Sequence, residues 1–168
     1  MEHLQSESFW FCSDYAKNQE KGRLMVIYGN NGVGKSLVAK GISNFAFKSR
    51  VNYQKSIVNP THVKVPDVQY AHWPRFLDSL KEGNWESVTE AGRVCLLVLD
   101  EVGGAYDPSG MGTDKLCSIL SHREQKWTVV TTNLTPEHWE VAFDRRIASR
   151  FFRNATHVEM NNVADYHI

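Results

Sequence analysis

The sequence has little cysteine, little proline and no excess of charge of either sign. Its 168 residues include 3 cysteines and 5 prolines, and its 19 basic residues equal its 19 acidic ones. Cys12, Cys95 and Cys117 lie far apart and form no CxxC pair, which predicts free thiols in a reducing compartment. The balanced charge argues against a polybasic nucleic-acid binder. Any DNA contact must therefore come from a local patch or from several subunits together.

Long apolar runs and targeting signals are also missing. No stretch approaches the ~20 apolar residues that a membrane helix needs, and the start, Met-Glu-His-Leu-Gln-Ser-Glu, lacks the basic and apolar regions of a signal peptide. We therefore expect a cytoplasmic protein with no membrane partner. What is present suits one α/β domain, because the length is that of a single domain and 42% of the residues are hydrophobic.

Short apolar runs alternate with helical patterns along the chain. The predicted strands are residues 24–28, 94–99 and 127–132 and a final short strand at 156–160, with a weaker candidate at 51–54. The predicted helices are residues 8–18, 36–47, 73–80, 113–125 and 136–152, and the predicted loops are 56–67 and 103–112. In the first helix, Phe9, Trp10 and Tyr15 should face inward. Strands that alternate with helices predict a parallel sheet with helices on both faces.

A phosphate-binding loop follows the first strand. The stretch Gly29-Asn30-Asn31-Gly32-Val33-Gly34-Lys35-Ser36 matches G-x-x-x-x-G-K-[ST] at every fixed position. Glycines let the backbone turn tightly, so that successive amides point at one phosphate, and the helix that follows presents its positive end. Lys35 would supply a cation for the outer phosphates and Ser36 a hydroxyl for Mg²⁺. Because the motif lies between a strand and a helix, we prefer ATP binding by residues Gly29 to Leu37 to a chance match in a turn.

Two later strands end in polar residues. The apolar strand before Asp100 and Glu101 makes a Walker B pattern, in which Asp100 would hold Mg²⁺ and Glu101 would polarise the attacking water. This pair favours hydrolysis over transfer to a bound acceptor. Asn133 would hydrogen-bond the γ-phosphate or the water, since parallel strands bring their carboxyl ends to one edge. The alternatives are that the two carboxylates only cap a strand end and that Asn133 only caps a turn.

Residues 144–153 are dense in arginine. One interpretation is a solvated helix face. The other is an arginine finger, whose planar guanidinium would stabilise transition-state charge on the γ-phosphate held by a neighbouring subunit. Arg150, directly before Phe151, is the first candidate for this role, and Arg146 is the second.

These motifs, in this order, resemble an AAA+ ATPase core. Residues 129–134, Val-Val-Thr-Thr-Asn-Leu, followed by residues 146–151, Arg-Ile-Ala-Ser-Arg-Phe, look like the DnaC-type helicase loaders and the related IstB-type transposition ATPases. The resemblance covers about residues 8–160. It implies that the Walker A residues are Lys35 and Ser36, the Walker B residues Asp100 and Glu101, the sensor 1 residue Asn133 and the arginine finger Arg150.

The resemblance also implies a fold, an assembly and partners. The fold would be a P-loop NTPase sandwich with a five-stranded parallel sheet in the order 5-1-4-3-2. The assembly would be an ATP-dependent ring or spiral that acts on DNA with a helicase or a transposase. Two departures from a full loader are expected. The ATPase core would span residues 1–160, with no helicase-binding domain before it, and residues 161–168 would form a tail in place of the helical lid.

Three hypotheses remain for the use of ATP. The first is a DNA-associated assembly ATPase that recruits or remodels a replication or transposition partner. Its weak candidates for DNA contact lie near Trp73, Arg75 and Lys81, although Trp73 and Phe76 fit the core better. The second is a nucleotide-dependent adaptor with little hydrolysis. The third, a small-molecule kinase, is disfavoured because a kinase has no use for Asn133 after a Thr-Thr strand.

Overall fold

Five parallel strands form the centre of the protein. The computed structural model describes residues 2–17, 23–57, 68–104, 107, 109–143, 145–153 and 155–161, without the side chains of residues 2–6, 17, 49–57 and 150–153. The strands are β1 (Leu24–Tyr28), β2 (Val68–His72), β3 (Leu96–Val102), β4 (Trp127–Thr132) and β5 (Ala155–Glu159). Their order is β2-β3-β4-β1-β5, with every pair parallel. From the other edge this is 5-1-4-3-2, which confirms the predicted fold class.

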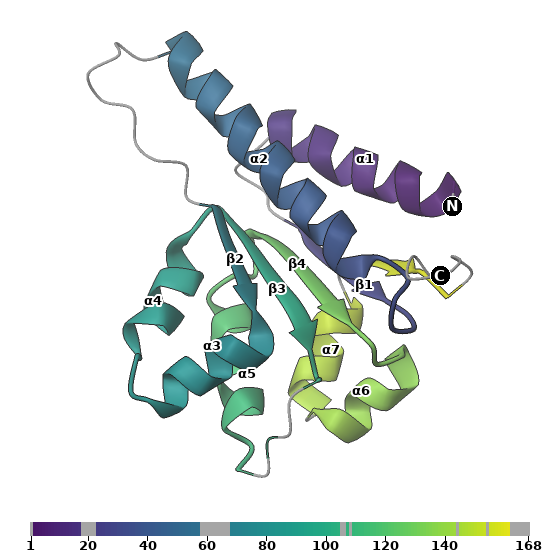
Figure 1. The fold of residues 1–168 in the computed structure, drawn as a ribbon, viewed down its shortest axis with the longest axis vertical. Coiled ribbons are helices and arrows are strands. Elements are labelled where there is room, and N and C mark those ends of the chain that lie inside the picture. Colours follow the sequence, from purple (N-terminus) through teal and green to yellow (C-terminus); the bar gives the residue numbers. More distant parts are fainter. Residues whose placement is uncertain are drawn as a thin grey trace.

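Helices cover both faces of the sheet, as Figure 1 shows. One face carries α1 (Glu2–Lys17) and α2 (Lys35–Ile57). The other face carries α3 (Trp73–Lys81), α4 (Glu86–Arg93), α5 (Met111–Ser121), α6 (Pro136–Ala142) and α7 (Arg145–Arg153). Met25 and Ile27 pack against α1 and α2, whereas Val26 packs on the opposite face, because successive strand residues point to opposite sides. Each fully buried aliphatic side chain contributes about 1.5–3 kcal/mol, so the strand ends are firmly held.

Helix α1 buries a different set of aromatic side chains from the predicted one. The prediction for Phe9 and Trp10 is wrong, since they are 65% and 55% exposed. Phe11 and Tyr15 are buried and pack edge-on against Trp127. Their ring centroids lie 4.9 and 5.6 Å, respectively, from that of Trp127. Residues four apart lie on the same side of a helix, so a stripe through Phe11 and Tyr15 turns the other two rings away from the sheet.

The second strand is not where the sequence pattern placed it. Residues 51–54 continue α2 and are not a strand, so the predicted helix was too short. The edge strand is β2, at Val68–His72, which was not predicted; it pairs with β3 from Val68 opposite Leu96 to His72 opposite Asp100. Residues 58–67, most of the predicted loop before it, lie outside the described residues.

The remaining elements lie close to their predicted places. β1 and β4 have the predicted bounds, whereas β3 continues to Val102 and α4 was not predicted. The region predicted as one helix at residues 136–152 is two helices, because Phe143 adopts an extended conformation after α6. None of the helices in the described parts of the chain is long and apolar enough to cross a membrane.

Candidate nucleotide-binding site

The loop between β1 and α2 has backbone conformations that only glycine adopts easily. Gly29 and Gly34 have φ angles of +148° and +91°. A Cβ atom at Gly29 would lie 3.1 Å from the carbonyl carbon of Met160, so the loop packs directly on the chain that leaves β5. The two glycines therefore allow both the turn and the close approach.

Lys35 opens α2, and its amine lies against the loop. Its Nζ donates hydrogen bonds to the carbonyl oxygens of Gly29 and Asn30, at 2.9 and 2.5 Å, and the residue is buried. Burial lowers the pKa of Lys35, while the charges of Asp100 and Glu101 oppose this shift. The loop thus holds a cation at the point where the motif predicts bound phosphate.

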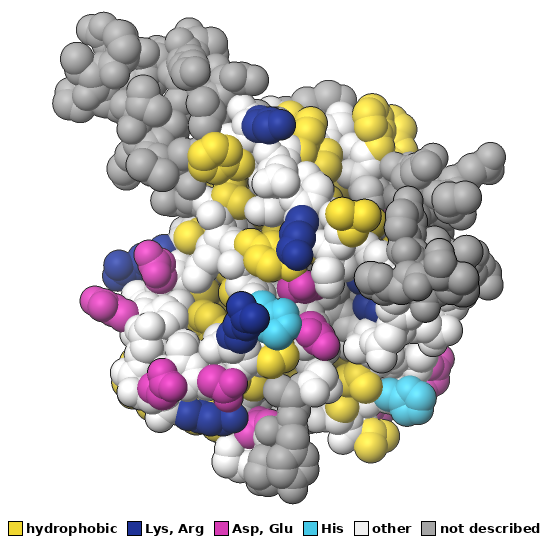
Figure 2. Space-filling view, in the orientation of Figure 1, with side chains coloured by type: hydrophobic (Ala, Val, Ile, Leu, Met, Phe, Trp, Pro, Cys, Tyr) yellow, Lys and Arg dark blue, Asp and Glu magenta, His cyan; other side chains and the backbone are white. Residues whose placement is uncertain are grey.

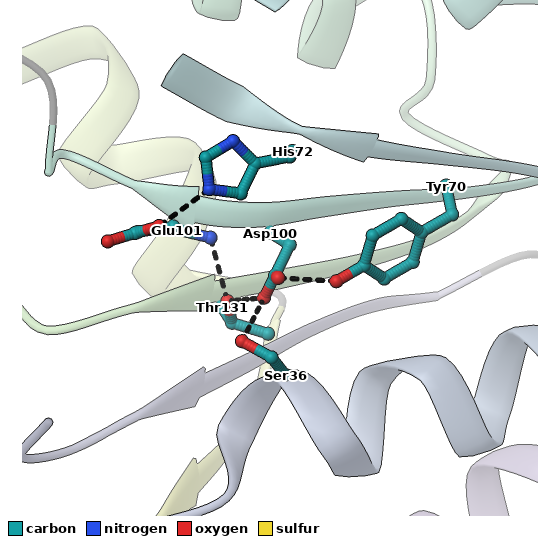
Figure 3. Close-up of polar contacts among 6 residues, drawn as sticks. All are labelled: Ser36, Tyr70, His72, Asp100, Glu101 and Thr131. Carbon is teal, nitrogen blue, oxygen red and sulfur yellow. Dashed lines mark hydrogen bonds and ion pairs between the residues drawn. The ribbon is translucent and has the colours of Figure 1, made fainter. Parts of the chain in front are cut away.

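Asp100 lies at the centre of a cluster of hydroxyl groups (Figure 3). Its Oδ1 accepts hydrogen bonds from Ser36 Oγ at 2.9 Å and Thr131 Oγ1 at 2.5 Å, and its Oδ2 accepts one from the Tyr70 hydroxyl. Leu96 and Val98 in β3 point toward α2, so strand alternation directs Asp100 toward the same helix and Ser36. The carboxylate is buried and satisfied by donors from α2, β2 and β4.

Glu101 lies in a β-bulge. Leu99 pairs with Val130 and Val102 with Thr132, so β3 contains one residue more than β4 between these pairs. Glu101 is the extra residue, and its φ of +65° is in the left-handed region, which costs a residue other than glycine about 1–3 kcal/mol. Bulges redirect side chains next to functional sites. Here the bulge directs the carboxylate toward β2.

Two hydrogen bonds fix Glu101 in this position. Its backbone N–H donates to Thr131 Oγ1 at 2.9 Å, and its Oε2 lies 2.7 Å from His72 Nε2 (Figure 3). Thr131 therefore orders both acidic residues. The Glu101 side chain remains 47% exposed and the His72 side chain 37% exposed.

A single cavity joins the loop to the strand ends. Its volume is about 410 Å³, and its described lining is Asn31, Gly32, Gly34, Lys35, Ser36, Leu37, Glu101, Thr131 and Asn133. Asn133 reaches it because Thr132 Oγ1 fixes the turn, donating to Val102 O at 2.7 Å and accepting from Leu134 N–H at 3.1 Å. The fold thus brings the predicted loop, Glu101 and Asn133 together around one cavity, and Asp100 accepts a hydrogen bond from Ser36 in its lining.

The arginine-rich helix α7 contributes no described residue to the lining of this cavity. Its buried Ile147 packs on the sheet face opposite α2. Arg146 lies 4.0 Å from Asp114 of α5 within the same chain, and both side chains are exposed. The backbone of Arg150 belongs to α7, but its side chain lies outside the described residues.

Four residues of the site were missed from the sequence. Thr131 could have been found by alternation, since it follows Val129 on the same side of β4. Tyr70 and His72 also alternate, but the strand that carries them was not predicted. Asn161, predicted to begin a tail, accepts a hydrogen bond from Asn30 N–H at 3.0 Å and donates one to Glu159 at 2.7 Å. No local signal marks Asn161, because its contact is made across the fold.

The oxygen atoms at Ser36 and Asp100 fit a magnesium site. Ser36 Oγ and Asp100 Oδ1 lie 2.9 Å apart at the end of the glycine-rich loop. Mg²⁺ prefers such hard oxygen ligands and usually combines one or two of them with substrate phosphates and water. The donor set therefore agrees with the chemistry that the motif predicts.

Comparison with known proteins supports the same class of fold. No protein-family model and no curated protein matches the sequence. Among solved structures, the chain is similar to the DnaC helicase loader (TM-score 0.71, 17% identity, 94% of this chain and 90% of that one) and to DnaI (0.70, 20%, 94% and 85%). It is also similar to the replication initiator DnaA bound to AMPPCP and single-stranded DNA (0.66, 19%, 91% and 45%).

These matches define the class at the level of the fold. The chain has the fold of the AAA+ ATPase core, as the resemblance in the motifs implied, and shares this fold with DnaI and with the DnaC helicase loader. It spans less than half of the DnaA chain that it matches.

Proposed function

We propose that this chain is an ATPase of the AAA+ type, which binds ATP with Mg²⁺ and hydrolyses it. The observation that carries this proposal is the single cavity of about 410 Å³ in which Lys35, Ser36, Glu101 and Asn133 meet. Its size is in the range of small-molecule sites. A glycine-rich loop at a helix N-terminus, a cation and a pair of carboxylates are the parts that phosphoryl transfer to water requires.

Each side chain has a proposed part in the reaction. When ATP binds, the amine of Lys35 gives up its hydrogen bonds to the carbonyl oxygens of the loop and donates to the outer phosphate oxygens instead. Ser36 and Asp100 hold Mg²⁺, which when bound neutralises charge on the phosphates. Glu101 orients the attacking water and accepts its proton, and Asn133 hydrogen-bonds the γ-phosphate or that water.

Two substitutions test this assignment. Lys35→Ala removes the cation at the loop and should abolish nucleotide binding, measured with a fluorescent ATP analogue. Glu101→Gln should keep binding and reduce phosphate release about 100-fold or more, because a general base typically contributes at least that factor. Glu90→Gln, on the exposed part of α4, is the matched control and should change neither measurement. Normal turnover in the Glu101→Gln variant would refute the role of Glu101.

We further propose that the ATPase acts on DNA in replication or transposition, as a helicase loader or a loader-like protein. The fold supports this, whereas the visible charge does not point to one DNA-binding face. Lys and Arg side chains are interspersed with Asp and Glu on the face drawn in Figure 2. Trp73 and Phe76 are buried in the core, as expected, and Lys81 pairs with Asp78 at 3.2 Å. This face offers no single basic patch, and we propose that subunits combine their patches to bind DNA.

This part of the proposal has its own test. ATP turnover is measured at low salt, at high protein concentration, with single-stranded DNA, with double-stranded DNA and without DNA. We expect DNA to be bound by the assembled form and to raise turnover. Absence of both binding and stimulation would remove the DNA-associated hypothesis without affecting the ATPase assignment.

One observation favours a second candidate, a nucleotide-dependent adaptor that hydrolyses ATP slowly. The carboxylate of Glu101 is hydrogen-bonded to His72 rather than free to orient water. If wild-type turnover is minimal, if Glu101→Gln leaves it unchanged and if ATP still drives assembly, the adaptor is the better description.

A further inference from the structure

Asp100 receives a hydrogen bond that no motif of the sequence predicts. Ser36 and Thr131 both donate to its Oδ1, at 2.9 and 2.5 Å, so Oδ2 is left to a third donor. That donor is the hydroxyl of Tyr70 from the edge strand β2 (Figure 3). Both oxygens of the carboxylate are thus engaged, and Tyr70 alone among these three donors acts on Oδ2.

Packing fixes the position of the Tyr70 ring. Tyr70 pairs in register with Val98 of β3, and its half-buried ring packs against the hydrophobic cluster beneath α1 and α2. The amine of Lys40, one turn into α2 beyond Ser36, lies 5.8 Å from the ring centroid. The ring is held between the strand and the phosphate-loop helix, so its hydroxyl is directed at Asp100 by the fold itself.

We propose that Tyr70 is a positioning residue for the magnesium site: its hydroxyl holds Asp100 toward Ser36 so that the pair can bind the ion. This inference rests on the proposed roles of Ser36 and Asp100. Ser36 can bind an ion through a lone pair of its oxygen and still donate its proton to Asp100, and Tyr70 and Thr131 are the two further donors that orient the carboxylate. Partners of ligating carboxylates set their orientation, and removal of such a partner typically costs about 10–100-fold in metal affinity.

The test is Tyr70→Phe, which removes the hydroxyl and keeps the ring. Equilibrium binding of a fluorescent, non-hydrolysable ATP analogue is measured over a titration of Mg²⁺ and again in EDTA. We expect the Mg²⁺ concentration at half-effect to rise about tenfold or more. Affinity in EDTA and the melting temperature should stay near the wild-type values. Tyr28→Phe, a hydroxyl deletion on β1, is the matched control and should leave the Mg²⁺ dependence unchanged.

A double substitution identifies the route of the effect. In a chain that already carries Asp100→Asn, Tyr70→Phe should add no further shift, because Tyr70 acts through that carboxylate. An additional shift of similar size would overturn the proposal. The proposal would also be overturned if Tyr70→Phe left the Mg²⁺ midpoint unchanged or lowered it while analogue binding by the wild-type chain depends on Mg²⁺. If wild type binds the analogue with no Mg²⁺ dependence, the metal assignment of the proposed function fails, and this inference fails with it.

Discussion

Arg123 is a buried charge that is satisfied by carbonyl oxygens. It is 3% exposed. Its Nε donates to Thr128 Oγ1 at 2.9 Å, one terminal nitrogen donates to the carbonyls of Ala91 and Val94 at 2.8 Å, and the other donates to that of Trp127 at 2.6 Å. Burial lowers the pKa of Arg123 to about 10. The planar guanidinium thereby joins the end of α4 to the start of β4, on the strand that carries Thr131 and leads to Asn133.

We expect Arg123→Met to destabilise the fold by about 2–4 kcal/mol, because several buried carbonyls would lose their donor. Arg123→Lys should recover part of this loss, since an ammonium group keeps the charge but cannot span all of the acceptors. The free energy of unfolding in urea measures both. Arg75→Met, on the exposed side of α3, is the control and should stay within about 0.5 kcal/mol of wild type. An equally small effect for Arg123→Met would contradict the structural role of the guanidinium.

The residue scale also shows which site residues can be predicted. Lys35, Ser36, Asp100 and Glu101 stand in motifs in which spacing and chemistry coincide, so the sequence predicts that they meet. Their roles remain predictions until the variants are measured. Tyr70 belongs to no such motif, and only pairing in the sheet brings it to the carboxylate of Asp100.

At the scale of elements, the bulge in β3 decides where Glu101, the proposed general base, points. Regular alternation would place Glu101 on the side of Leu97 and Leu99, which pack on the face opposite α2. The extra residue instead lets Glu101 reach His72, at 2.7 Å. The edge strand β2 therefore contacts both acidic side chains, Glu101 through His72 and Asp100 through Tyr70.

We expect His72→Ala to raise ATP turnover by up to about fivefold, because it frees Glu101 to orient water and an exposed pair of this kind contributes at most about 1 kcal/mol. His72→Gln is the matched variant, since its amide can still donate to the carboxylate, and it should stay near wild type. Steady-state phosphate release checks both. A drop in turnover for His72→Ala would mean that the imidazole holds Glu101 in its working position.

The errors in the predicted secondary structure have a common cause. Residues 51–54 contain a β-branched and an aromatic residue that favour a strand, yet they continue α2. Intrinsic preferences differ by a few tenths of a kcal/mol and tertiary context overrides them. The real edge strand, Val68–His72, has Gln69 and His72 in place of a continuous apolar run. An edge strand needs little burial, so its pattern is weak.

At the scale of the whole molecule, the described residues of the arginine-rich helix lie apart from the cavity that we propose binds nucleotide in the same chain. The described lining of that cavity includes no residue of α7, and Ile147 anchors α7 on the face opposite α2. Arg146 and Arg150 are one helical turn apart, and Arg146 lies near Asp114. This placement supports the proposal that Arg150 serves the site of a neighbouring subunit.

Mixing experiments test the arrangement between subunits. We expect Arg150→Ala to lower turnover about 1,000-fold or more, the range of an arginine finger. Adding Glu101→Gln subunits, which are inactive themselves but carry Arg150, should restore turnover above the sum of the two separate preparations. Arg145→Ala, also on α7, should behave like wild type. If no ratio of the two inactive variants restores phosphate release, Arg150 does not act in a neighbour's site.

The sequence by itself determined the class of fold and predicted the residues of the proposed nucleotide site. Glycine conformations, buried strand runs and the spacing of Lys35, Ser36 and the acidic pair are local properties, and local chemistry constrains them strongly. Alternation of strands and helices then predicts a parallel sheet, and parallel strands bring their ends together.

Only the tertiary structure decided the surroundings of those parts. The Tyr70 and His72 contacts with the acidic pair, the bulge at Glu101 and the contact of Asn161 with the loop depend on which strands pair and in what register. These contacts join residues 29 to 131 positions apart in the sequence. Pairing across such separations is set by the summed burial of the whole core and leaves no local pattern, so the sequence could predict the chemistry of the site but not what holds it in place.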